Sequence, residues 1–175
     1  AGSYTYTVTD ANGCSTTTSI TVSEPTALSA SSSQGAAILC NGGTTTVTVL
    51  ATGGIAPYTG EGTFTVGAGT FTYTVTDDNG CSTTTSITVS EPTALSASSS
   101  ATAILCNGGS ATVTVSATGG TAPYSGDGSF TVGAGSYTYT VTDANGCSTT
   151  TSITVSEPTA LSASSSSTAI LCNGG

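Results

Sequence analysis

The chain has 175 residues, of which nine are Asp or Glu and none is Lys, Arg or His, giving a formal net charge of −9. Without basic side chains it cannot neutralise phosphates, which excludes nucleic acid as a partner and electrostatic binding to anionic lipid. Without His or Lys, no Ser or Cys nucleophile has a base to activate it, and acid–base chemistry is left to isolated carboxylates, so we expect no enzyme.

A long repeat organises the chain. The block of residues 1–33 recurs unchanged at residues 134–166 and with three substitutions at residues 68–100. The copies lie 67 and then 66 residues apart, whereas solenoid coils have periods of about 20–45 residues. Each period is therefore predicted to be a small domain. Because the chain starts and stops inside a repeat, we expect it to be a segment of a longer array.

The first predicted element is a β-hairpin. Tyr4, Tyr6 and Val8 alternate with Thr up to a D-A-N-G turn, and the alternation resumes beyond it with Ile20 and Val22 in the apolar phase. This period of two is typical of strands that bury one face and expose the other. Asn-Gly accepts the positive φ of a tight turn, so the turn closes the hairpin.

The next period predicts three strands and a second hairpin. In chain order they are expected at residues 28–39, residues 44–52, residues 57–66 as one bent segment, and residues 70–90. Four valines point inward in this scheme: Val47, Val49, Val113 and Val115. The two periods differ in length by one residue, at Gln34-Gly35 against Ala101, which predicts a bulge or kink in the first strand.

Glu-Pro pairs mark the domain boundaries, because each follows a completed strand and Pro cannot continue a hydrogen-bonded ladder. The predicted domains are the C-terminal hairpin of a truncated repeat at 1–25, complete repeats at 26–92 and 93–158, and the first strand of a further truncated repeat at 159–175. No helical periodicity is present. The predicted fold is all-β: a tandem array of small Ig-like β-sandwich domains of about 66 residues and about five strands each.

Six cysteines occur at two per period. A zinc site would need four ligands and there is no His, so the cysteines indicate disulfides, an oxidising compartment and export. These residues contain no signal peptide, apolar span or anchor. We therefore expect the sorting information elsewhere in the full protein.

The disulfide pairing depends on how often the chain crosses each domain. If residues 57–66 form one strand, five crossings place Cys40 and Cys81 at opposite ends, about 26 Å apart for eight residues, and a disulfide tolerates only about 7 Å. Cys40 then pairs with Cys147 of the next domain. Six crossings instead give the internal pairs Cys40–Cys81 and Cys106–Cys147. We favour the bond between domains, because it stiffens a filament with short linkers. Cys14 pairs outside these residues under either count, and Cys172 is also expected to pair outside them.

The D-x-N-G turns also look like the opening of a calcium loop. The bidentate Glu that completes an EF-hand is missing, which favours a plain hairpin turn. The remaining metal candidate is a structural calcium at a domain junction, where Glu91 approaches Asp143 and Asn145. No other cofactor is expected.

Several motifs in order resemble a known family. CNGG is followed by ATGGTAPY at 117–124, AGSYTYTVTDANGC at 134–147 and ITVSEP at 153–158. This series resembles the SprB-type repeats of the giant cell-surface adhesins of gliding Bacteroidetes, and the resemblance covers all the residues. It implies type IX secretion, long surface filaments, and adhesion that is moved along the cell during gliding motility.

The predicted function is a non-catalytic, disulfide-stiffened stalk of an extracellular bacterial surface filament or adhesin. Its partners are neighbouring repeats of the same chain, and other copies in a filament. One alternative is a self-assembling fibre subunit that exchanges strands between chains, with the hairpin at 1–23 and the strand at 161–171 as complementary ends. Ice binding by rows of Thr is disfavoured because sandwich strands twist. Glycan binding is disfavoured because the tyrosines occupy inward phases.

Overall fold

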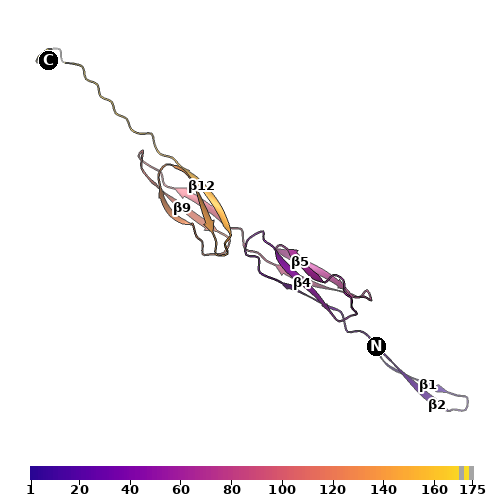
Figure 1. Ribbon diagram of the computed structural model, residues 1–175. Helices are drawn as coiled ribbons and strands as arrows, with labels where there is room; N and C mark the ends of the chain where they lie inside the picture. Colours follow the sequence, from indigo (N-terminus) through magenta and orange to yellow (C-terminus); the bar gives the residue numbers. More distant parts are fainter. Residues whose placement is uncertain (170–171, 174–175) are drawn as a thin grey trace. The chain divides into compact units, whose positions relative to one another are not determined.

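The computed structural model describes residues 1–169, 172 and 173. Within them the chain forms twelve β-strands and no helix, so the all-β prediction is confirmed. The chain divides into two compact units (Figure 1). Unit 1 comprises Ala1–Ile38 and Gly42–Glu91, and unit 2 comprises Leu39–Asn41 and Pro92–Gly175.

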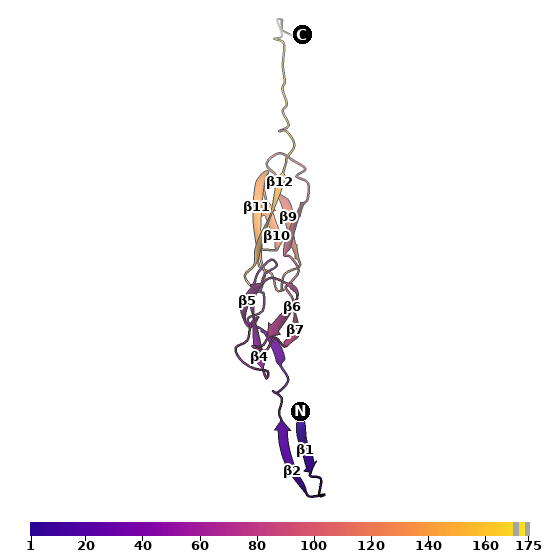
Figure 2. The ribbon, with the colours of Figure 1, turned by 90° about the vertical axis from the view of Figure 1, so that its right-hand side faces the viewer.

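Unit 1 holds three antiparallel sheets. Strands β1 (Gly2–Thr9) and β2 (Ser15–Val22) form a hairpin by themselves. A three-stranded sheet has the order β3 (Ser29–Gln34), β4 (Thr45–Thr52), β5 (Gly62–Val66). A second hairpin is made by β6 (Gly69–Thr76) and β7 (Ser82–Val89) (Figure 2).

Unit 2 repeats the last five of these strands. Its three-stranded sheet has the order β8 (Ser96–Ala101), β9 (Ala111–Thr118), β10 (Gly128–Val132), and its hairpin is β11 (Gly135–Thr142) with β12 (Ser148–Val155). Each complete copy of the repeat therefore has five strands. Residues 57–66, which the sequence allowed to form either one strand or two, contain one strand, β5.

In each unit, alternating Thr and Val side chains place one apolar layer between the three-stranded sheet and the hairpin that follows it in the chain. In unit 1 the buried residues of β4 meet those of β6 and β7, and in unit 2 the same positions of β9, β11 and β12 meet. The valines of β4 and β9 that were expected to point inward are between 0% and 2% exposed, which confirms that expectation. Two sheets facing each other across one apolar layer are consistent with a β-sandwich.

Hydroxyl pairs join the sheets at one edge. In unit 1 the Ser32 and Thr85 hydroxyls are 3.0 Å apart between β3 and β7. In unit 2 the Ser99 and Thr151 hydroxyls are 3.0 Å apart between β8 and β12. These side chains are partly buried, so the hydrogen bonds satisfy polar groups that the packing of the sheets removes from water.

Aromatic rings fill the other side of each core. The rings of Phe64 and Tyr73 stack with centroids 4.8 Å apart, and those of Phe130 and Tyr139 are 4.7 Å apart. The hydroxyls of Tyr73 and Tyr139 are buried and have no hydrogen-bond partner among the described residues. The aromatic rings of Tyr73 and Tyr139 pack in the core, so these two side chains contribute to the structure through their rings and not through their hydroxyls.

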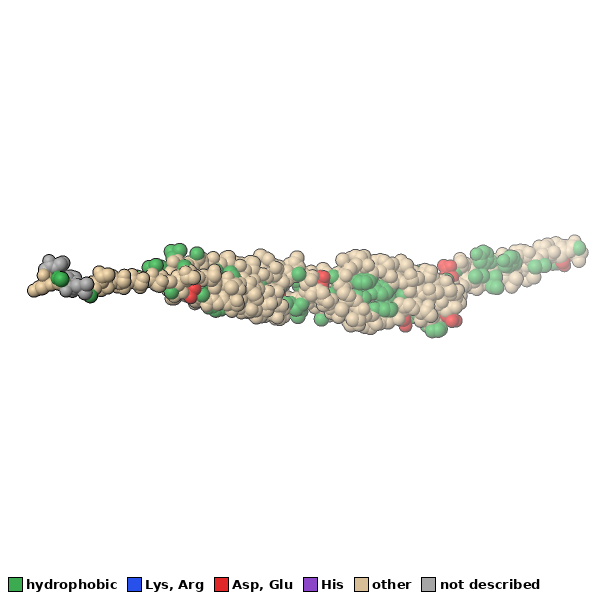
Figure 3. Space-filling model, turned by 90° about the horizontal axis from the view of Figure 1, so that it is seen from above, with side chains coloured by type: hydrophobic (Ala, Val, Ile, Leu, Met, Phe, Trp, Pro, Cys, Tyr) green, Lys and Arg blue, Asp and Glu red, His purple; other side chains and the backbone are tan. Residues whose placement is uncertain are grey.

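The β1–β2 hairpin keeps its apolar face exposed. Its sequence is identical to that of β11–β12, yet Val8 is 63% exposed while Val141 is 0% exposed. Figure 3 shows apolar side chains gathered over this hairpin at the right-hand end. No three-stranded sheet packs on it within the described residues, as one does on β6–β7 and β11–β12.

Three predictions about the first and third strands differ from the structure. The first strand ends at Gln34 instead of residue 39. Its pairing with β4 is regular to that point, so the predicted bulge within it is wrong. The third strand begins at Gly62, and Thr59 forms only an isolated bridge to Thr76. Gly60 lies between them with φ 85°, where a Cβ would overlap the Thr74 carbonyl.

The strand predicted at 159–175 is not formed in its described part, residues 159–169, 172 and 173. The remaining positions, 170, 171, 174 and 175, lie outside the described residues. β3 and β8, which have nearly the same sequence, are each paired along their length with the next strand of the repeat. A strand forms only where a neighbour takes its backbone hydrogen bonds, and 159–169 has none in the described structure.

Candidate functional site

The turn between β11 and β12 is organised by one buried carboxylate. Asp143 Oδ1 accepts hydrogen bonds of 2.9 Å from the backbone N–H groups of Asn145 and Cys147, and Oδ2 accepts one of 2.9 Å from Thr121. Its side chain is 6% exposed. A carboxylate that receives these donors fixes the turn. It therefore also fixes the place of Cys147 at the start of β12.

The same contacts set the charge state of Asp143. Burial raises the pKa of this carboxyl, but backbone N–H groups of Thr121, Cys147, Asn145 and Gly146 lower it, and the net pKa lies below the ordinary value of 3.8. Hydrogen bonds to the charged form favour that form. The turn is therefore built around a carboxylate that stays ionised in mild acid.

Acid should weaken this turn. Because the folded pKa of Asp143 is lower than the unfolded one, its contribution to the free energy of unfolding is present above pH 3.8 and is lost as the pH falls through the folded pKa. Asp143→Asn should lower the thermal midpoint of unit 2 at pH 7 and flatten its acid dependence, because an amide N–H₂ then faces a backbone N–H. Calorimetry from pH 2 to 7 measures both, with exposed Asp127→Asn as the matched control. An unchanged midpoint in Asp143→Asn would contradict this role.

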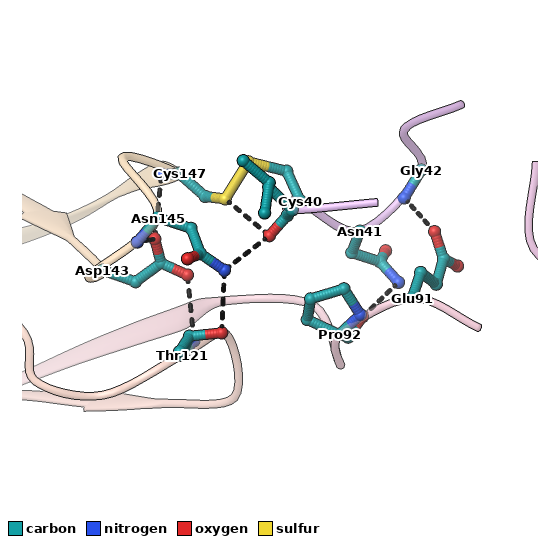
Figure 4. The surroundings of a disulfide bond; sticks show 10 residues. Cys40, Asn41, Gly42, Glu91, Pro92, Thr121, Asp143, Asn145 and Cys147 are labelled. Carbon is teal, nitrogen blue, oxygen red and sulfur yellow. Dashed lines mark hydrogen bonds between the residues drawn. A yellow bond between two sulfur atoms is a disulfide. The ribbon is translucent and has the colours of Figure 1, made fainter. Parts of the chain in front are cut away.

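Unit 2 also holds the segment Leu39–Asn41 beside this turn (Figure 4). Cys40 and Cys147 form a disulfide with a Cα–Cα distance of 5.7 Å, within the range usual for disulfides. The Asn145 side-chain N–H₂ donates to the Leu39 carbonyl and to the Thr121 hydroxyl, both at 3.0 Å. The Asn145 amide thus positions the backbone next to the disulfide.

The Asn that follows the cysteine binds the linker. Asn41 donates to the carbonyl of Pro92 at 3.1 Å within unit 2, as Figure 4 shows. In the next repeat Asn107 donates to the carbonyl of Pro158 at 3.1 Å. The C-N-G-G motifs at 40–43 and 106–109 are therefore each attached to the Glu-Pro pair that follows them in the chain.

The Glu of the same pair binds the first Gly of the motif. In unit 1 the Gly42 N–H donates to Glu91 Oε2 at 2.6 Å, and in unit 2 the Gly108 N–H donates to Glu157 Oε2 at 2.6 Å. Sequence reasoning missed this role and treated Glu91 only as a calcium candidate. The available signal was the constant spacing of C-N-G-G and Glu-Pro, which are 49 residues apart from Gly to Glu in both copies.

The disulfide is the one expected for five crossings. It joins the C-N-G-G cysteine of one sequence repeat to the D-x-N-G-C cysteine of the next, across 107 residues. Neither internal alternative, Cys40–Cys81 or Cys106–Cys147, is formed. Four cysteines are exposed free thiols in the structure: Cys14, Cys81, Cys106 and Cys172.

The calcium candidates are engaged in other contacts. Asp143 accepts backbone N–H groups with both oxygens, Glu91 accepts the Gly42 N–H, and Asn145 presents its N–H₂ to two oxygens. The described residues contain no group of three or more His, Cys, Asp or Glu side chains arranged for a metal ion. The D-x-N-G sequence builds a hairpin turn in each copy.

No protein-family model matches this chain, and no curated protein is significantly similar to it. In the part of the chain that the structure describes, no helix is long and apolar enough to cross a membrane.

Proposed function

We propose that this chain is a non-catalytic stalk of an extracellular bacterial surface filament or adhesin, built as a tandem array of Ig-like domains in which repetition supplies length. Its role is mechanical: it holds other parts of the full protein away from the cell. The resemblance to SprB-type repeats extends this proposal to the surface of gliding Bacteroidetes.

The Cys40–Cys147 disulfide is the observation that carries the proposal. The sequence repeats 26–92 and 93–158 follow each other directly in the chain, and the disulfide between Cys40 and Cys147 adds a second covalent connection between these two repeats. An ordinary stabilising disulfide closes a loop within one domain. A bond between successive repeats instead resists their separation and their rotation about the linker, which is the property that a stalk requires.

Composition supports the same role. There is no Lys, Arg or His, so acid–base chemistry is left to isolated carboxylates and trypsin-like proteases find no cleavage site. The polar faces of the strands carry Thr and Ser, whose hydroxyls pair across neighbouring strands, as Thr72 does with Ser86 at 3.0 Å. Such a surface suits an exposed structural element.

One observation favours a second candidate, a fibre subunit that exchanges strands between chains. The apolar face of β1–β2 is exposed at Tyr4, Tyr6 and Ile20, which are 49%, 57% and 56% exposed. Exposed apolar sheet faces attract partners. Concentration-dependent assembly of the chain under reducing conditions would favour this candidate over a stalk with one chain in cross-section.

Chains lengthened by whole 66-residue periods test the stalk. Small-angle scattering of arrays with one, two and three added periods should show a maximum dimension that rises by a constant step, at least about 26 Å for a strand of eight residues. A compact fold instead grows only as about the 0.38 power of chain length. Steps that shrink with each added period would reject the stalk.

A further inference from the structure

Unit 1 has an unfilled hollow next to a free cysteine. The hollow has a volume of about 250 Å³ and is lined by nine residues: Glu24, Pro25, Thr26, Ala27, Leu28, Gly54, Asp77, Asn79 and Cys81. Cys81 is exposed and unpaired. The turn that carries it is held as in unit 2, because Asp77 Oδ1 accepts the Cys81 N–H at 2.8 Å and Oδ2 accepts the Ile55 N–H at 3.1 Å.

On the same surface of unit 2, Cys40 and Asn41 form part of the wall of a hollow. This hollow is also lined by Ala94, Leu95 and Cys147, the counterparts of Ala27, Leu28 and Cys81. Leu39–Asn41 thus lies on the surface whose counterpart in unit 1 is open.

The bonds that hold the segment have counterparts in unit 1. Asn79 is the counterpart of Asn145, whose side chain donates to Leu39, and the Asn79 side chain is exposed with no hydrogen bond among the described residues. Pro25 is the counterpart of Pro92, whose carbonyl accepts the Asn41 amide. Unit 1 therefore presents the thiol, the amide donor and the carbonyl of a site to which, in unit 2, the segment Leu39–Asn41 is bonded.

The matching segment is presented elsewhere in the chain. Residues 104–109 repeat the sequence Ile-Leu-Cys-Asn-Gly-Gly of residues 38–43. Leu105 is 85% exposed, whereas its counterpart Leu39 is 55% exposed. Cys106 is an exposed free thiol, and Asn107 and Gly108 are already held by Glu157 and Pro158. The segment is thus ordered in the form that Leu39–Asn41 has when bonded.

We propose that the hollow at Cys81 is a docking site for the Leu-Cys-Asn-Gly-Gly segment of a second copy of this chain, which it captures through a disulfide to Cys81. Two observations distinguish this site from a merely reactive thiol. In unit 1 no segment lies bonded to the cysteine beside the hollow, and in unit 2 this same segment is bonded at the corresponding cysteine. The inference depends on the proposed function in one respect, which is that a second copy of this chain must lie close enough to react.

The covalent step is an ordinary thiol–disulfide reaction. At the cell surface the two cysteine thiols lose two protons and two electrons to a disulfide oxidant, which is reduced to two thiols, and an S–S bond forms. With an activated peptide no net oxidation is needed. The Cys81 thiolate attacks the peptide sulfur, the mixed disulfide breaks, and an aromatic thiolate leaves with the electron pair.

The test uses the full chain and the peptide Ile-Leu-Cys-Asn-Gly-Gly activated as its 2-nitro-5-thiobenzoate disulfide. Chymotrypsin, cutting after Tyr and Leu, separates Cys14 on peptide 7–28 from Cys81 on peptide 74–95. Cys14 follows the same D-x-N-G turn and is exposed on the β1–β2 hairpin, as Cys81 is on β6–β7. The peptide should label Cys81 at least tenfold faster than Cys14, while the parent aromatic disulfide without peptide should label the two at similar rates.

Asn79→Ala should slow peptide labelling of Cys81 about fivefold, since it removes one neutral hydrogen-bond donor, and Asn12→Ala should not change labelling of Cys14. Air oxidation of the full chain should give oligomers in which Cys81 is bonded to a C-N-G-G cysteine of another copy. Equal peptide labelling of Cys81 and Cys14, a preference for Cys81 that persists without the peptide, or an internal Cys81–Cys106 bond in monomers would each overturn the proposal. None of these results alters the scattering test of the stalk.

Discussion

Val141→Asp is expected to unfold unit 2, while Val8→Asp leaves folding unchanged. The two valines occupy the same position of identical hairpins, yet Val141 is 0% exposed and Val8 is 63% exposed. A carboxylate at 141 would lie in an apolar core, and the chain has no Lys, Arg or His side chain to pair with it. Burying an unpaired charge costs on the order of several kcal/mol. Besides Val141 itself, the described part of unit 2 has five buried apolar residues in its core to oppose that cost.

Backbone hydrogen exchange read by mass spectrometry measures this effect unit by unit. In Val141→Asp the amides of β8–β12 should lose protection, whereas those of β3–β7 should keep it. Val8→Asp serves as the control for added charge, because it introduces the same side chain into the same local sequence. Retained protection of β9 and β11 in Val141→Asp would contradict the burial that the structure assigns to this valine.

Cys40→Ser is expected to give the second largest effect, a loss of about 2–4 kcal/mol in the free energy of unfolding of unit 2. The disulfide closes a loop of 107 residues, and in the chain-entropy account long loops give the larger stabilisations. The substitution also releases Leu39–Asn41 from the turn that Asp143 organises. Urea unfolding of Cys40→Ser and of the unsubstituted chain, monitored by hydrogen exchange in unit 2, measures the difference in the free energy of unfolding.

Cys106→Ser is the matched control. It removes the cysteine of the same C-N-G-G motif one repeat later, where the thiol is free. It should therefore leave stability within experimental error of the unsubstituted chain. A Cys106→Ser loss as large as that of Cys40→Ser would mean that the motif stabilises through packing and not through the disulfide.

Much of the fold could be predicted because its signals are local. Alternating Thr and Val place Val47 and Val49 inward in any strand that contains them, and Asn-Gly after Asp closes a tight turn wherever it occurs. The end of the first strand at Gln34 was missed because the residues beyond it, Gly-Ala-Ala-Ile-Leu, are small or apolar and include no Pro that would end a strand. They leave the sheet because C-N-G-G is bound by Glu91 and Pro92, which lie far away in sequence.

The sequence limited the pairing of Cys40 to two alternatives but could not decide between them. The choice between Cys40–Cys147 and Cys40–Cys81 depended on whether residues 57–66 form one strand or two. In the structure Gly62–Val66 is a single strand paired with β4, while Thr59 forms only a bridge. The close approach of Gly60 to the Thr74 carbonyl makes this bend, and that contact joins residues that no local pattern relates.

The two identical hairpins separate what sequence determines from what tertiary structure decides. The sequence of 1–22 and of 134–155 gives the same strands, register and turn in both places, because alternation and turn chemistry act between near neighbours. Yet Cys147 is bonded and Cys14 is free. Burial needs a facing sheet, and covalent pairing needs a C-N-G-G segment from another part of the chain. Of the two identical hairpins in the described structure, only β11–β12 has both.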